Sequence, residues 1–157
     1  MSSKVEPYIR VQREDFDLQA EVDRLSTQTS GIGAIVTFSG LCRDEGGKLA
    51  ALELEHYPGM AEAEIARHVE EALKRWPLTG VTVIHRIGRL TPGEAIVLVA
   101  ALSTHRADAF EVVRILMDYL KTDAPLWKKE TGPQGARWIE PRSEDYARRL
   151  KAEEETK

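Results

Sequence analysis

The sequence has one cysteine, Cys42, and no apolar run close to the length of a membrane span. A single cysteine excludes a disulfide within the chain, a two-cysteine redox relay and a metal site built from several cysteines. A transmembrane helix needs about 20 consecutive apolar residues, so we expect no membrane insertion. Residues 1–7 also lack the apolar core of a secretion signal, which makes the cytoplasm the expected location.

The chain lacks an excess of positive charge: 22 Lys and Arg residues stand against 26 Asp and Glu, which gives a formal net charge of −4. This balance gives no general attraction to nucleic acid or to an anionic membrane surface. The four histidines, at positions 56, 68, 85 and 105, show no short metal-ligand spacing, so we expect no zinc or iron site. A site for an anionic ligand therefore has to be a local cluster of basic side chains.

What the sequence does contain is the composition of one globular domain. Its 157 residues are 42% hydrophobic and 31% charged, which is ordinary for a protein with a real core. No internal repeat or low-complexity linker divides the chain. We expect a single domain over residues 1–157, in which residues 143–157 form a charged C-terminal tail.

Hydrophobic periodicity predicts an alternation of short strands and a few helices. The strands are expected at residues 5–11, 34–39, 49–57, 81–87, 95–102, 126–130 and 137–140, and the helices at 15–25, 61–76 and 107–121. Residues 34–39 have the pattern of a buried strand, and residues 95–102 that of a central strand. Strands outnumber helices and several connections are short, which favours an α+β fold with a mixed, largely antiparallel sheet.

Two lysines, Lys121 and Lys128, flank a predicted turn around Pro125. At 100° per residue, Lys121 falls on one helical stripe with Phe110 and Met117, at the edge of the expected buried face. The turn can bring both ammonium groups to one pocket. A lysine with apolar surroundings and a second cation nearby suits acid, base or nucleophilic chemistry. The alternative is that both are ordinary surface lysines.

A second basic cluster is expected where the strand at 95–102 gives way to a helix. A helix N-terminus attracts anions, and His105 and Arg106 would add donors suited to phosphate. The alternative is a helix cap, from Ser103 or Thr104, followed by a solvent-facing arginine. Arg43 lies in a glycine-rich loop after a strand, where ligand contacts are common, although a solvated loop charge explains it equally well.

Cys42 also has two interpretations. Its thiol, beside Arg43, could be a sulfur-carrying nucleophile. The other interpretation is a small residue at the end of a strand, and the local pattern favours this one.

Five stretches together resemble the family of the large, catalytic subunit of molybdopterin synthase. They are residues 33–40, 54–60, 83–88, 103–106 and 117–128. The resemblance implies an α/β hammerhead fold and a homodimer. Each subunit would bind a small ubiquitin-like sulfur carrier, giving a heterotetramer, with the carrier's C-terminal Gly-Gly thiocarboxylate in the pocket. The substrate would be cyclic pyranopterin monophosphate, which receives two sulfurs to form the molybdopterin dithiolene.

The same resemblance assigns roles to individual residues. It implies that Lys121 and Lys128 are the active-site lysines. The positions that match the family's substrate-binding residues are Arg43, His105, Arg106, Arg142, Phe38 and Met117. It implies no cofactor and no metal, and it makes the carrier the source of the sulfur, which favours a structural role for Cys42. Cys42 departs from the family pattern, where an aliphatic residue is common, and the sequence leaves open which pocket residues a neighbouring chain supplies.

The leading hypothesis is therefore an enzyme, a sulfurtransferase of molybdenum cofactor biosynthesis. The runner-up is a non-catalytic module in which the same lysines clamp the C-terminal tail of a carrier protein. A nucleic-acid-binding protein is the third possibility, and the acidic net charge opposes it.

Overall fold

The computed structural model describes residues 5–28, 30–44, 46–47 and 50–139. In this part of the chain, three helices and two four-stranded sheets form an α+β fold, as the periodicity predicted. None of these helices has the length and apolar character required to cross a membrane. The expected C-terminal tail at 143–157 lies outside the described residues.

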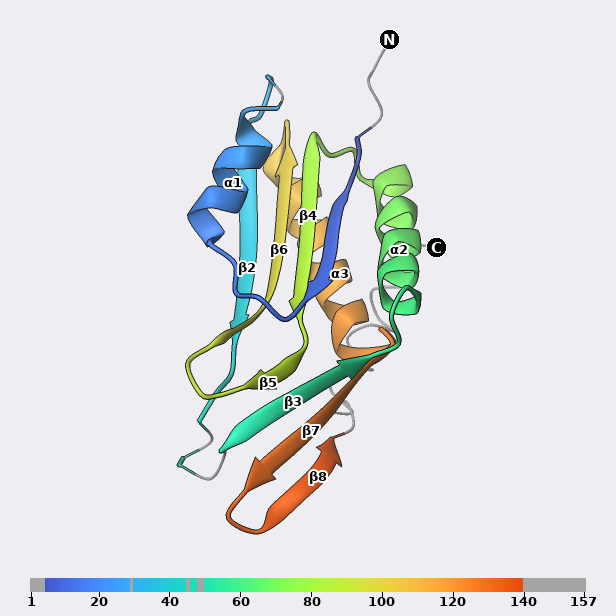
Figure 1. The fold of residues 1–157 in the computed structure, drawn as a ribbon. Helices are drawn as coiled ribbons and strands as arrows, with labels where there is room; N and C mark the ends of the chain where they lie inside the picture. Colours follow the sequence, from blue (N-terminus) through green and yellow to red (C-terminus); the bar gives the residue numbers. More distant parts are fainter. Residues whose placement is uncertain (1–4, 29, 45, 48–49, 140–157) are drawn as a thin grey trace.

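The first sheet has the strand order β1-β4-β6-β2 (Figure 1). Its strands are β1 (Tyr8–Gln12), β4 (Gly80–Arg86), β6 (Ala95–Ser103) and β2 (Ala34–Leu41). Only the β1–β4 pair is parallel, and β4–β6 and β2–β6 are antiparallel. The nearly all-apolar segment at 95–102 is confirmed as a central strand.

The second sheet has the order β5-β3-β7-β8 and is wholly antiparallel. Its strands are β5 (Gly88–Leu90), β3 (Ala51–His56), β7 (Leu126–Gly132) and β8 (Gly135–Ile139). Strand β5 was not predicted, because three residues are too few to show an alternation. The division into two sheets was not predicted either, since periodicity identifies strands but not their partners.

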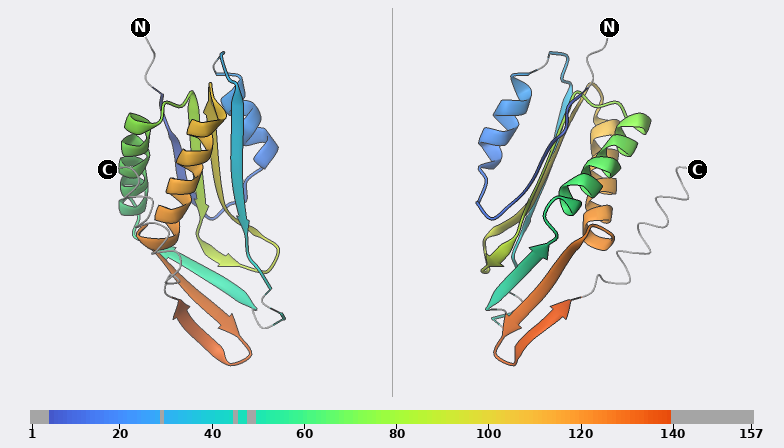
Figure 2. Two further views of the ribbon diagram at one scale, coloured as in Figure 1. Left: turned by 180° about the vertical axis from the view of Figure 1, so that it is seen from behind. Right: turned by 45° about the vertical axis from the view of Figure 1, so that its right-hand side comes forward.

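The helices are divided between the two faces of the first sheet. Helix α1 (Leu18–Ser26) lies on one face, and α2 (Met60–Arg75) and α3 (Arg106–Thr122) lie on the other, as the right-hand view of Figure 2 shows. The main core is the layer between the sheet and the helices α2 and α3. Its centre is made of fully buried aliphatic side chains, each worth about 1.5–3 kcal/mol in burial.

Strand β2 corrects one expectation. Residues 34–39 were predicted to be a buried strand, but β2 is the edge strand of the first sheet. Three of its large apolar side chains are strongly exposed: Ile35 by 45%, Phe38 by 40% and Leu41 by 59%. A run of apolar residues at a sheet edge has the same local pattern as a buried strand, and only the pairing distinguishes the two.

Candidate functional site

Helix α3 separates the predicted basic residues into two groups. His105 is the residue that caps the helix N-terminus, and Arg106 is its first residue, whereas Lys121 lies in its last turn. At 1.5 Å per residue, Arg106 and Lys121 are about 22 Å apart along the helix axis. Figure 1 shows the two ends of α3 at opposite ends of the first sheet. One chain therefore does not bring all the predicted residues into one pocket.

The lysine group is built by a tight turn between α3 and β7. The backbone N–H groups of Asp123 and Ala124 both donate to Tyr119 O, and the N–H of Leu126 donates to Ala124 O at 2.7 Å. Strand β7 then pairs with β3 so that Lys128 lies opposite Leu54, which is almost fully buried. This turn fixes the backbone positions of Lys121 and Lys128 relative to each other.

The exposure of Lys121 corrects a second expectation. It was predicted at the edge of the buried face, but its side chain is exposed, and Phe110 on the same stripe is 60% exposed. Met117 is half-buried and packs against the main core, and Lys128 is half-buried. The helical spacing was read correctly, but the stripe faces outward along most of its length.

A buried histidine, His85, feels the charge of both lysines. His85, near the end of β4, is only 3% exposed. Burial is the main cause that lowers the pKa of His85 to about 4; the positive charges of Lys128 and Lys121 add to it, and the hydrogen bond to the Arg86 carbonyl opposes it. That the turn brings both ammonium groups to one pocket stays a prediction.

The other group is held by the start of β2. The N–H of Gly33 donates to Ser103 O at 2.9 Å, and the Ser103 hydroxyl donates to the carbonyl of His105. A Cβ on residue 33 would lie 2.0 Å from Thr104 O, so only glycine fits there. Neither Ser103 nor Thr104 caps α3, which corrects the predicted cap. The N-terminus of the helix, with exposed His105 and Arg106, remains suited to an anion.

Arg43 and Phe38 belong to the edge strand and the loop that follows it. Arg43 is exposed, and the preceding Cys42 is fixed by two backbone bonds, from its own N–H to Glu94 O at 2.8 Å and from the N–H of Gly93 to its carbonyl at 2.7 Å. Cys42 itself is 4% exposed and packs with Leu52, Leu54 and Leu90. Its burial favours the interpretation as a structural residue.

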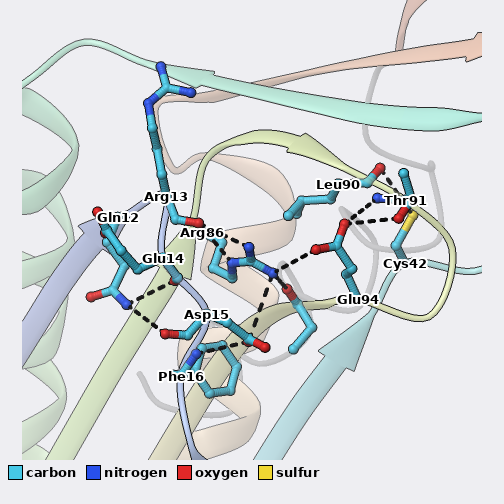
Figure 3. Close-up of polar contacts among 11 residues, drawn as sticks. Gln12, Arg13, Glu14, Asp15, Phe16, Cys42, Arg86, Leu90, Thr91 and Glu94 are labelled. Atoms are coloured by element: carbon cyan, nitrogen blue, oxygen red, sulfur yellow. Dashed lines mark hydrogen bonds and ion pairs between the residues drawn. The ribbon is translucent and has the colours of Figure 1, made fainter.

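Sequence reasoning missed Arg86, whose guanidinium connects several segments near the loop that carries Arg43. Its guanidinium donates to Arg13 O at 3.0 Å and to Ala95 O at 3.0 Å, and it lies within 3.8 Å of the carboxylates of Asp15 and Glu94 (Figure 3). Glu94 also accepts from the backbone N–H of Thr91. A charged residue at the end of an otherwise apolar strand was the available signal. Arg142 lies outside the described residues.

The class of protein follows from comparison with known proteins. The family model described as "MoaE protein" matches residues 11–123. A solved structure, "Molybdopterin biosynthesis MoaE protein from Burkholderia ambifaria MC40-6", superposes with a TM-score of 0.81 at 49% identity, covering 93% of this chain and 97% of that one. The crystal structure of molybdopterin synthase from Staphylococcus aureus gives a TM-score of 0.74 at 34% identity, covering 82% and 94%. These likenesses confirm the fold expected from the resemblance.

The chain belongs to the MoaE family. A relative from Mesorhizobium japonicum (strain LMG 29417 / CECT 9101 / MAFF 303099), named "Molybdopterin synthase catalytic subunit", is 55% identical over 159 aligned positions. The alignment covers 99% of this chain and all of the relative. The family resemblance inferred from five short stretches is thus confirmed over the full length.

Proposed function

We propose that this protein is the catalytic subunit of a molybdopterin synthase and that it acts as a sulfurtransferase. The sulfur donor would be a small ubiquitin-like carrier with a C-terminal Gly-Gly thiocarboxylate, and the acceptor would be cyclic pyranopterin monophosphate. The observation that carries the proposal is the full-length match to a relative of that name at 55% identity. The expected location is the cytoplasm.

The lysine group supplies chemistry that fits this reaction. When the carrier's sulfur bonds to a carbon of the pterin side chain, an oxygen leaving group has to depart and negative charge builds up. An ammonium group can stabilise that charge and can deliver a proton to the leaving oxygen. We assign these roles to Lys121 and Lys128, whose positive charges both lower the pKa of His85.

The proposal is tested by removing each lysine. Lys121→Ala and Lys128→Ala should each lower dithiolene formation by roughly 10²–10³-fold, because each removes a charge-stabilising donor. Lys129→Ala is the matched control, since Lys129 lies over the ring of Trp138 at 5.8 Å on the opposite face of β7 from Lys128. The measurement is turnover with thiocarboxylated carrier and pterin substrate.

The outcome of this test separates the enzyme from the runner-up function. Near-normal turnover in both variants would contradict the assigned roles. A wild-type protein that binds the carrier but forms no dithiolene would instead be a module that clamps the carrier tail.

We further infer that the active site is completed by a second copy of the chain. Phosphate binding by His105 and Arg106 and chemistry at the lysines require one site, yet about 22 Å of helix separates the two groups. Among the described strands, the edge strand β2 pairs with β6 on one side only, and its exposed apolar residues suit pairing with another chain. Phe110, exposed on α3 beside it, extends this apolar surface.

A two-fold axis normal to the first sheet would join the two groups. Antiparallel pairing of β2 with β2 of the partner subunit keeps both copies of α3 on the same face of a continuous sheet, because α3 packs on β2 and β6. The two α3 helices then run in opposite directions. The N-terminal end of one helix, with its His105 and Arg106, thus lies level with the lysine end of the other.

A further inference from the structure

The exposed large hydrophobic side chains of the described residues fall into two patches, with Leu18 on α1 as the exception. One patch is the surface of β2 and α3 that we assign to a second copy of the chain. The other lies on the second sheet and on the segment that joins β3 to α2, and we call it the aromatic surface. Its members are Tyr57, Met60, Trp127 and Trp138. The proposed pairing of β2 does not involve this second patch.

The two tryptophans of the aromatic surface lie on one face of the second sheet. Lys129 of β7 is opposite Trp138 of β8, and Trp127 comes two residues before Lys129, so the tryptophans are diagonal neighbours on that face. Such neighbours are about 7–8 Å apart, within reach of large aromatic side chains. Trp127 is 46% exposed and Trp138 is 56% exposed. They therefore form one apolar area and not two scattered side chains.

Tyr57 and Met60 extend this area to the end of the second sheet. Trp127 lies opposite Glu55 of β3, and Tyr57 comes two residues after Glu55, just beyond the end of that strand. Met60 is the first residue of α2. Tyr57 is 69% exposed and Met60 is 44% exposed. Figure 1 shows that β3 ends, and β7 begins, beside the C-terminal end of α3. The aromatic surface therefore reaches the α3–β7 turn.

The lysine pair is found at this same end of the second sheet. Lys121 lies in the last turn of α3, and Lys128 follows Trp127 directly on β7, with its side chain on the opposite face of the strand. Two extended residues span at most about 7 Å. A carrier whose C-terminal Gly-Gly reaches Lys128 therefore has its folded body against the protein surface around β7, which is where the aromatic surface lies.

We propose that the aromatic surface docks the folded body of the sulfur carrier while the carrier's tail enters the site of the two lysines. This inference rests on the proposed function. Aromatic and methionine side chains are enriched at protein interfaces, and buried tryptophans often contribute much of the affinity. A tail of two glycines has no side chain by which one carrier differs from another, so the body has to supply the specificity. The matching surface of the carrier should be apolar and lie next to its tail.

The affinity for the carrier tests this docking surface. Trp127→Ala and Trp138→Ala should each raise the Kd for the carrier by roughly 10–100-fold, because each removes a large apolar anchor. Leu18→Ala is the matched control, since Leu18 is an exposed apolar residue outside both patches, and it should change the Kd by less than about 2-fold. Isothermal titration calorimetry with a carrier that ends in an ordinary carboxylate measures each Kd without any turnover.

A carrier that lacks its C-terminal Gly-Gly separates the body from the tail. It should still bind the wild-type protein, and Trp127→Ala should remove this remaining binding. Loss of all binding when the tail is deleted, or an unchanged Kd in both tryptophan variants, would overturn the proposal. A tryptophan variant with a smaller oligomer in sedimentation and an unchanged Kd would assign the surface to a second copy instead. If the docking is confirmed but the wild-type protein forms no dithiolene, the proposed function fails and the docking surface stands.

Discussion

At the scale of single residues, His85 is unusual because it is an ionisable side chain buried in the core. It is almost completely buried, and its surroundings contain two cations but its hydrogen bond is to a carbonyl. Burial and the lysine charges both disfavour the protonated ring. The residue therefore couples the stability of the fold to the pH.

This coupling predicts a loss of stability in mild acid. The pKa of His85 is about 4 in the folded protein against 6.5 for an ordinary histidine, so between these values the unfolded state binds more protons. Stability is then lost as the pH falls below 6.5, and the loss is complete below about 4. Between pH 7 and pH 5 the wild type should lose about 2 kcal/mol more unfolding free energy than His85→Gln. Urea unfolding at both pH values checks this, and equal losses would contradict it.

At the scale of elements, one guanidinium joins segments that are distant in sequence. Arg86 ends β4, and its bonds reach the carbonyl of Arg13, just after β1, and that of Ala95, at the start of β6. Through Glu94 it also holds the turn that pairs with Cys42. The loop carrying Arg43 thus starts from a fixed point. The sequence marks Arg86 as a charged residue at the end of an apolar strand, but it does not indicate these partners, because they depend on three strands meeting.

Removing this guanidinium should destabilise the fold strongly. Arg86 is 7% exposed, and Arg86→Met would leave the carbonyls of Arg13 and Ala95 without their donor. A hydrogen bond to a charged group contributes about 1.5–3 kcal/mol, so the loss of these bonds should lower the unfolding free energy by about 3 kcal/mol. Arg89→Met is the control, because Arg89 is exposed on β5. Chemical denaturation measures both variants, and equal stabilities would show that Arg86 contributes nothing specific.

At the scale of the whole molecule, the two basic groups at opposite ends of α3 are the main observation. A single chain presents a helix N-terminus suited to an anion and, about 22 Å away along the helix axis, a lysine pair, so the two groups do not reach one small substrate. It also presents an apolar edge strand, which on a monomer is an aggregation risk. Pairing of β2 with β2 of a second copy would cover the apolar edge. It would also bring the helix N-terminus of one chain to the lysine pair of the other.

Mixing two inactive variants tests the shared site. Lys128→Ala and Arg106→Ala homodimers each lack an intact site, but a mixed dimer holds one site with both residues. Co-expression should therefore recover about a quarter of wild-type dithiolene formation, because half of the dimers are mixed and one of their two sites is intact. Lys128→Ala mixed with Lys121→Ala is the control and should recover none. No recovery in the first mixture would contradict a site that takes its lysines from one chain and Arg106 from the other.

The sequence by itself determined the elements, the α+β class and the residues that attract attention. Apolar periodicity located all three helices of the described residues, and the flanks of Lys121 and Lys128 marked the turn that joins α3 to β7. Local patterns carry this information because helices, strands and turns follow from nearby residues.

Only the tertiary structure decided what those elements face. It placed β2 at an edge, turned the stripe of Phe110 and Lys121 outward, and set His105 a helix length from the lysines. It also buried His85 and Arg86 where three strands meet. Burial and pairing depend on contacts between residues far apart in the chain, which a local pattern does not contain.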